Sequence, residues 1–188
     1  MTELATARLS LRPVRLDDFE EMAALWADER FTRPIAGRGA LTTEEVWFRL
    51  LRDLGQWGVR GYGSWTIRLV EGGAYVGNVS ILDHRRLIDP PIDDPELGWG
   101  LAPAFQGRGF AKEALEAALA WADAHLTAAR TLCMISPDNP ASVRLAERVG
   151  YRPYRRTTYR DEPVQLFERP QDANWARTGR RLIEPAPP

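Results

Sequence analysis

The pattern of apolar residues along the chain predicts seven strands and four helices. Strands are expected where apolar and polar residues alternate, or where a short apolar run lies between turn residues, at 8–14, 62–70, 75–82, 96–101, 131–136, 151–159 and 164–168. Helices are expected where apolar residues recur at helical spacing, at about 17–28, 42–57, 111–126 and 140–149. This mixed order predicts an α/β (α+β) fold.

Capping and turn residues set several of these boundaries. Asp17 and Thr42 each stand three residues before a Glu, which is the spacing of a capping box at a helix start. Asn139, followed by proline, predicts another helix start, and Gly150 predicts the end of that helix. Pro, Gly and acidic residues predict loops at 31–41 and 83–95 and a turn at 161–163.

The strand at 96–101 differs from the others in its second face. Leu97, Trp99 and Leu101 alternate with Glu96 and two glycines. Because side chains on a strand point alternately to opposite faces, the three apolar residues share one face. The other face carries a carboxylate beside two positions without side chains. The sequence therefore predicts a groove that begins at Glu96.

The segment after this strand is suited to bind a phosphate. Residues 106–111 read Gln-Gly-Arg-Gly-Phe-Ala and contain no Ser, Thr, Asp or Asn to cap the helix that follows. The first N–H groups of that helix therefore lack a local partner. A helix N-terminus is partly positive, and Arg108 adds a full charge, so a phosphate would satisfy this segment. The alternative is a glycine-rich turn that only connects a strand to a helix.

Composition limits the class of protein. The chain has 188 residues, of which 44% are hydrophobic, and this suits one domain, expected at 1–169, with a partly disordered tail at 170–188. A net charge of -1 argues against nucleic acid or a membrane surface as a partner. We expect a cytoplasmic protein, since Cys133 is the sole cysteine and no leader or membrane span is evident. We also expect no metal, because His84 and His125 stand apart from other ligand residues.

Three segments together resemble a known family. Residues 106–111 fit the pattern Gln/Arg-x-x-Gly-x-Gly/Ala of the GNAT superfamily of N-acetyltransferases. The preceding Glu-Leu-Gly-Trp-Gly-Leu-Ala-Pro at 96–103 and the segment 139–151 look like its RimJ/RimL-like branch, which acetylates the N-termini of ribosomal proteins. The three segments follow one another in the family's order, within elements that extend from about residue 8 to residue 169.

The resemblance implies a sheet of seven strands, mostly antiparallel, with about four helices on its faces. The fourth and fifth strands, here 96–101 and 131–136, would splay apart and hold the pantetheine arm of acetyl-CoA between them. It further implies that acetyl-CoA contacts the main chain of the first of these strands, the phosphate-binding turn and the start of the last helix, at Trp99, Gly100, Leu101, Gln106, Gly107, Arg108, Gly109, Phe110, Ala111 and Asn139.

Two residues are candidates for catalysis. Attack on a thioester requires a neutral amine, and Glu96 at the start of the predicted groove is our candidate for the base that takes the proton. Many members of the family protonate the departing thiolate with a Tyr, but Ala146 stands at that position here, and Ser142 is our substitute. A solvated carboxylate at Glu96 and a local backbone contact of Ser142 are the structural alternatives.

The predicted function is transfer of an acetyl group from acetyl-CoA to a primary amine, either a protein N-terminus or a small amine. A binding module of the same fold that has lost catalysis is the main alternative, because the family's Tyr is missing. The expected partners are therefore acetyl-CoA and an amine acceptor, and a homodimer stays open. An arginine-bearing nucleic-acid binder is the remaining rival, and the overall charge argues against it.

Overall fold

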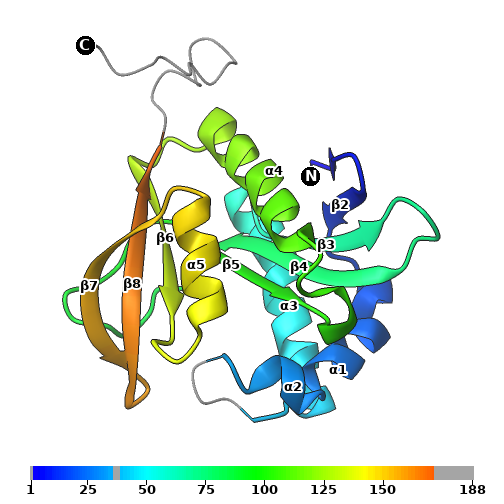
Figure 1. Ribbon diagram of the computed structural model, residues 1–188, viewed down its shortest axis with the longest axis horizontal. Coiled ribbons are helices and arrows are strands. Elements are labelled where there is room, and N and C mark those ends of the chain that lie inside the picture. The colour runs from blue at the N-terminus through cyan, green and yellow to red at the C-terminus, as the bar shows by residue number, and fades with distance from the viewer. Residues whose placement is uncertain (1, 36–38, 172–188) are drawn as a thin grey trace.

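The computed structural model describes residues 2–35 and 39–171, and these form an eight-stranded sheet with helices on both faces (Figure 1). The strand order is β1-β2-β3-β4-β5-β6-β8-β7. The strands are β1 (Leu4–Ala5), β2 (Leu9–Pro13), β3 (Ser64–Leu69), β4 (Tyr75–Leu82), β5 (Glu96–Leu101), β6 (Arg130–Ile135), β7 (Arg152–Tyr159) and β8 (Glu162–Pro170). The helices are α1 (Phe19–Trp26), α2 (Glu29–Thr32), α3 (Thr43–Arg60), α4 (Phe110–His125) and α5 (Pro140–Arg148), with 3₁₀ turns at Leu16–Asp18 and Pro103–Phe105.

The sheet confirms the predicted fold class and adds one strand. Its neighbouring strands are antiparallel except for β5 and β6, which are parallel. The eighth strand is β1, which pairs two residues with β2. The hydrophobic pattern did not reveal it because two residues are too few to show alternation.

Two predicted irregular segments were partly wrong. The first part of the expected loop at 31–41 belongs to α2, where the side chain of Asp28 accepts a hydrogen bond from the Arg30 N–H and caps the helix. One turn of helix is too short to show a periodic pattern. The last hairpin turns at Arg160 and Asp161, both with positive φ, and not at 161–163. The part of the expected tail that follows Gln171 lies outside the described residues.

Helix boundaries follow the caps, with two differences. Thr42 and Glu45 form the predicted capping box, but α1 starts after Asp18 and not at Asp17. The third helix continues through Gly55 and Gly58 and ends at Gly61, whose φ of 73° is the left-handed conformation that glycine adopts readily. Packing of α3 against the sheet therefore outweighs the helix-weakening effect of its two internal glycines.

Two apolar clusters hold the helices on the sheet. On one face, α4 packs against β2, β3, β4 and β5 in a core that includes Trp65, Leu97 and Leu115. On the other face, α1, α2 and α3 share a cluster that includes Trp26, Phe31 and Leu50. The second cluster places α2 and α3 over the face of β5 that carries Glu96.

A buried carboxylate ties the first helix to the sheet. Asp18 is fully buried and accepts two hydrogen bonds from Arg12 on β2, at 2.6 and 2.8 Å. It also accepts one from the Thr66 hydroxyl on β3 at 2.7 Å, one from the Arg15 N–H at 2.9 Å and one from Arg68 at 3.3 Å. Because β2, β3 and the start of α1 meet at one charge, we expect this network to fix α1 on the sheet.

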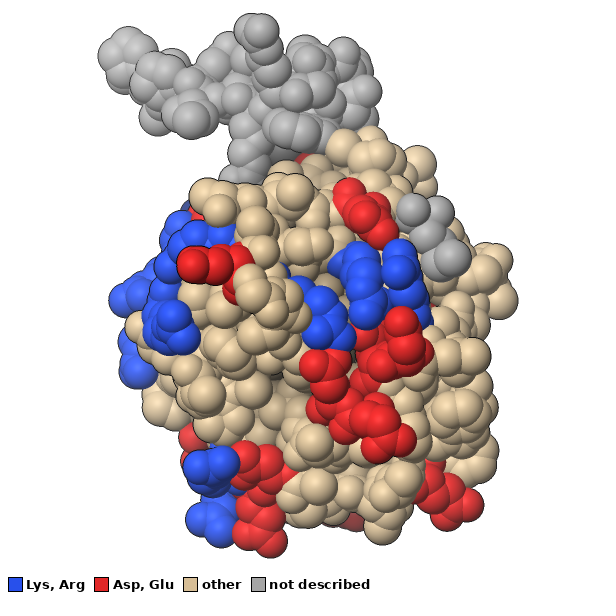
Figure 2. All heavy atoms as spheres, turned by 90° about the vertical axis from the view of Figure 1, so that its right-hand side faces the viewer, with Lys and Arg blue, Asp and Glu red and all other residues tan. Residues whose placement is uncertain are grey.

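Charged side chains are mixed on the surface. On the face drawn in Figure 2, basic and acidic groups lie beside one another, with uncharged surface between them. Exposed ion pairs of this chain include Arg8–Glu113, Arg33–Glu29 and Lys112–Glu116. Among the helices of the described ranges, none is long and apolar enough to cross a membrane.

Replacing Asp18 by Asn should destabilise the fold by about 3 kcal/mol in urea unfolding at neutral pH, because the change leaves Arg12 without its buried partner. Burial alone would raise the pKa of Asp18, but hydrogen bonds from Arg12, Thr66 and the Arg15 backbone lower it below its ordinary value. Its contribution is therefore complete above about pH 4 and is lost as the pH falls further. The difference between wild type and Asp18→Asn should shrink over that range, whereas Asp17→Asn, on an exposed neighbour, should change stability little.

Candidate functional site

The two central parallel strands separate after a single pair of residues. In the described sheet, β5 and β6 pair at Glu96 and Leu132 and at no later residue. Figure 1 shows β6, β8 and β7 on one side of this opening and β2 to β5 on the other. The predicted splay between the strands at 96–101 and 131–136 is therefore confirmed.

The splay leaves backbone groups of β5 without a strand partner. The carbonyl oxygen of Gly100 points toward β4, because it lies 2.1 Å from where a side chain on Gly77 would begin. Backbone groups alternate along a strand, so those of Trp99 and Leu101 point toward β6. The Leu101 oxygen accepts a hydrogen bond from the Gln106 side chain at 2.9 Å. The backbone of Trp99 therefore forms an open edge that an extended ligand could pair with.

A cavity of about 670 Å³ occupies the splay. Its floor is formed by β4 and β5, and one wall is formed by the end of β6 and the start of α5. The opposite side is covered by α2, α3 and residues 34–35 and 39–41, and the β7–β8 turn closes one end. Of the predicted residues it brings together Glu96, Trp99, Gly100, Asn139 and Ser142, although 43 residues separate Glu96 from Asn139 in the sequence.

The glycines of β5 have a packing role as well. A side chain on Gly100 would come within 2.6 Å of the Phe31 ring, and one on Gly98 within 3.1 Å of the Ser80 hydroxyl. The predicted groove is thus present, but α2 fills part of it with Phe31. Gly100 therefore provides room for the Phe31 ring. The carbonyl of Gly100 points toward β4 and not toward the open edge.

The turn before α4 has the conformation expected of an anion site. Gly109 is the N-cap residue, with φ of 81°, and no side chain caps the helix. Arg108 is exposed, with its guanidinium 4.8 Å from the centre of the Phe110 ring. On the other side of the turn, Arg8 donates a hydrogen bond to the Arg108 carbonyl at 3.1 Å. The uncapped N–H groups of the first helical turn thus remain available beside a cation.

The predicted base is held by an arginine that the sequence did not single out. Arg86 donates two hydrogen bonds of 2.5 Å, one to each carboxylate oxygen of Glu96. The Nε2 atom of His84 lies 3.9 Å from one of these oxygens. Glu96 is buried and lines the cavity, so it is not a solvated carboxylate at a strand end. If Glu96 acts as a base, it must accept its proton while Arg86 is bonded to both of its oxygens.

The predicted acid stands at the start of α5. The side-chain oxygen of Asn139 accepts the Ser142 N–H at 3.0 Å, as a helix cap does. The amide group of Asn139 donates to the Pro34 carbonyl at 3.2 Å, which joins α5 to the segment after α2. Ser142 lines the cavity, and its hydroxyl makes no hydrogen bond to another described residue. This hydroxyl is therefore able to turn toward a ligand.

A tyrosine also lines the cavity, and it comes from an element that the sequence did not connect with the site. Tyr159, at the end of β7, lies under the guanidinium of Arg86, whose central carbon is 4.7 Å from the ring centre. Ala146, where the family's Tyr would stand, is fully buried in the core. Tyr159 could have been found only from the pairing of β7 with β8, because nothing in its local sequence marks it.

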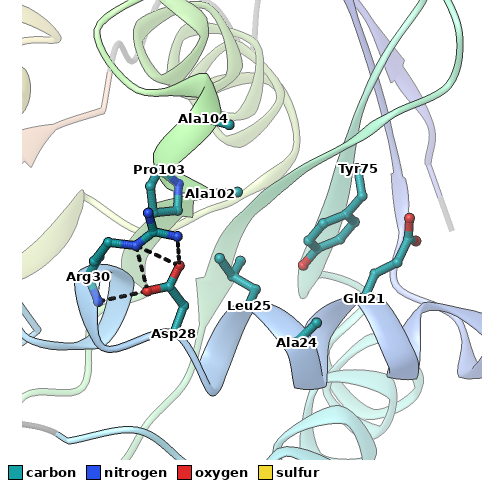
Figure 3. Close-up of a pocket in the computed structure, with 9 residues that line it drawn as sticks. All are labelled: Glu21, Ala24, Leu25, Asp28, Arg30, Tyr75, Ala102, Pro103 and Ala104. Atoms are coloured by element: carbon teal, nitrogen blue, oxygen red, sulfur yellow. Dashed lines mark hydrogen bonds and ion pairs between the residues drawn. The ribbon is translucent and has the colours of Figure 1, made fainter.

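A second pocket, of about 580 Å³, lies between α1 and the segment after β5. Figure 3 shows Asp28 and Arg30 bonded to one another on one side and Glu21 and Tyr75 on the other, with Leu25 between them. Burial raises the pKa of Tyr75 above its ordinary value, so its hydroxyl is not a base at neutral pH. Its charged groups already form ion pairs, and the pocket is not our candidate site. No group of His, Cys, Asp or Glu suited to a metal ion occurs among the described residues.

Comparison with known proteins agrees with this geometry. A relative from Bacillus licheniformis, the uncharacterized N-acetyltransferase p20, is 23% identical over 154 residues, which cover 81% of this chain and 83% of that protein. A putative GNAT-family acetyltransferase structure from Bordetella pertussis is 31% identical, covers 90% of this chain and 99% of its own, and has a TM-score of 0.79. The structure of RimL, a ribosomal-protein α-N-acetyltransferase in complex with coenzyme A, is similar in fold, with 17% identity, coverage of 92% and 99%, and a TM-score of 0.74.

The family assignment rests on a family model as well as on these individual relatives. A family model described as acetyltransferase (GNAT) domain matches residues 8–152, which include the splayed strands and the glycine-rich turn before α4. The described structure also has the splay after Glu96 that the resemblance implied and the uncapped start of α4 that the sequence predicted. The chain belongs to the GNAT family of acetyltransferases.

Proposed function

We propose that the chain is an acetyl-CoA-dependent N-acetyltransferase that transfers an acetyl group to a primary amine in a ternary complex. The observation that carries the proposal is the open edge of β5. One end of this edge is at Leu101, whose carbonyl accepts a hydrogen bond from Gln106, shortly before the uncapped start of α4. The other end is at the cavity that Glu96 lines. A long thioester substrate would satisfy both the helix N–H groups and the Trp99 backbone, and would place its acyl end in the cavity.

Each predicted residue then has a role in this proposal. Phosphates of acetyl-CoA would be held by residues 106–111, and the pantetheine arm would pair with the backbone of Trp99 and lie past Gly100 and Leu101. In the acetyl transfer, the amine nitrogen attacks the thioester carbonyl, the carbon–sulfur bond breaks, and CoA leaves as a thiolate. The amine loses one proton and the thiolate gains one, so the chain must accept a proton on one side and donate one on the other.

Glu96 is the proposed acceptor of the amine's proton. Arg86 fixes the orientation of the carboxylate through two charge-assisted hydrogen bonds. His84, beside the same carboxylate, offers an imidazole nitrogen to which the proton can pass. On the other side, Ser142 is the proposed donor to the thiolate, and Tyr159 is a second hydroxyl in the same cavity.

One observation favours the alternative of a binding module without catalysis. Arg86 already donates a short hydrogen bond to each oxygen of Glu96, so a proton taken from the amine would have to displace one of these two contacts. If His84 does not share the proton, Glu96 could serve only to hold Arg86 in the cavity wall. Measuring acetyl-CoA binding and acetyl transfer separately in variants of this site distinguishes an enzyme from a binding module.

Arg108→Glu should weaken acetyl-CoA binding at least about tenfold in calorimetry, because it replaces a charge-assisted contact with repulsion. Arg152→Glu, which makes the same charge change at an exposed position on β7, should leave the affinity unchanged. Equal losses in both variants would show that only overall charge matters and would remove the phosphate site from the turn. Gly109 is a poorer target, since its positive φ would strain any other residue.

Glu96→Gln should leave acetyl-CoA affinity close to wild type and lower the acetylation rate by about 100-fold. The loss should be greatest at neutral pH, where an alkylamine acceptor is mostly protonated. His84→Gln should shift the pH profile of the rate if the imidazole passes the proton on. Profiles of both variants that coincide with wild type would leave Glu96 a purely structural part of the cavity.

Ser142→Ala and Tyr159→Phe distinguish the two candidate acids. We expect Ser142→Ala to lower the single-turnover rate of CoA release by about tenfold or more, and Tyr159→Phe to change it less. The reverse order would assign the proton donor to Tyr159. A test with a CoA analogue whose leaving group needs no protonation should restore the rate of whichever variant has lost the acid.

A further inference from the structure

Cationic side chains surround the acceptor end of the cavity. Arg49 and Arg52 come from α3, Arg86 and His84 from the segment after β4, and Arg160 from the β7–β8 turn. The acidic residues that line the same cavity are Glu45 and Glu96. Three separate elements thus contribute arginines to one cavity, although the chain as a whole has a net charge of -1.

Both of the acidic residues already serve the fold. Glu96 is held by Arg86 through its two oxygens. Glu45 accepts hydrogen bonds from the Thr42 N–H at 2.8 Å and the Thr42 hydroxyl at 3.0 Å, and so caps α3. A ligand with a second ammonium group would have to compete with these contacts while facing the arginines.

The arginine at the hairpin tip is placed to meet a ligand. Arg160 is exposed, and its guanidinium lies 5.4 Å from the centre of the Tyr159 ring. Within the described ranges it makes no ion pair, in contrast to Arg52, which pairs with buried Asp53 at 2.6 Å. Its φ of 53° is that of a tight two-residue hairpin turn, which fixes the direction of its Cα–Cβ bond.

These cations lie away from the site proposed for the CoA phosphates. Arg86 and His84 lie beside Glu96, at the first residue of β5, whereas the phosphate-binding turn follows its last residue. Six residues of strand span about 17 Å. The cations at the Glu96 end of the cavity are therefore not needed for the phosphates. Arg86 already holds Glu96 and Arg52 already pairs with a buried aspartate, so Arg160 remains as a candidate to contact the other substrate.

We infer that the amine acceptor is a small molecule that carries a carboxylate close to its amino group, as an amino acid does, and that Arg160 binds this carboxylate. The inference rests on the proposed function and names the acceptor class for it. A cavity of about 670 Å³ has the size of a small-molecule site. An arginine binds a carboxylate through two parallel hydrogen bonds, while the amine points toward Glu96.

The test uses reaction products, which bind without any chemistry and carry no amine to titrate. Binding of N-acetyl derivatives of alanine, leucine and phenylalanine, each as the free acid and as the amide, is measured by calorimetry with protein saturated with CoA. We expect the acids to bind at least about tenfold more tightly than their amides. In Arg160→Asn, which tolerates the positive φ, this preference should disappear. Arg156→Asn, at an exposed position on β7, should keep it.

Three results would each overturn the inference. The amides could bind as well as the acids, N-acetylputrescine could bind more tightly than any acid, or the preference for acids could survive Arg160→Asn. Acetyl transfer to the free amines is measured separately. If the N-acetyl acids bind with the expected preference but the corresponding amino acids are never acetylated, the proposed function is refuted and the carboxylate site stands. Acetylation of polyamines or amides in preference to amino acids would support the function and refute this acceptor class.

Discussion

The early parting of β5 and β6 is the constraint on which the site depends. A parallel pair that stops after Glu96 and Leu132 leaves the main chain of β5 without a neighbour where a sheet would normally continue. Unpaired backbone groups away from water are costly, so such an edge is stable only if solvent or a ligand satisfies it. The fold therefore contains a place for an extended substrate at its centre, and α4 begins, uncapped, directly beyond that edge.

The cavity wall depends in turn on contacts far from it. The Asp18 network fixes α1 on β2 and β3, and the apolar cluster of α1, α2 and α3 then sets the position of Phe31. Phe31 packs on Gly100 and narrows the groove on the face of β5 that also carries Glu96. A change that loosens α1 is thus expected to alter acceptor binding before it alters acetyl-CoA binding, because the α4 turn is held separately by Arg8.

Local patterns were enough to predict most of the fold, and the sequence resemblance was needed for the site. Alternation and caps predicted β4, β5 and the start of α3, because these features act within a few residues. The short elements β1 and α2 lack a period to recognise. The partners of Glu96 could not be predicted, because Arg86 and His84 reach it from the β4–β5 loop. Tyr159, at the end of β7, in turn contacts Arg86. Contacts set by loop conformation and strand pairing leave no local pattern in the sequence.

The central claim is that acetyl-CoA completes the open edge of β5, and hydrogen exchange measured by mass spectrometry tests it directly. In the absence of ligand, the amide of Trp99 should exchange faster than those of Gly98 and Gly100, which point toward β4. Saturation with acetyl-CoA should slow exchange at residues 97–101 and 107–112 together. Protection confined to the pocket between α1 and residues 102–104, or no protection of β5 at all, would contradict the account.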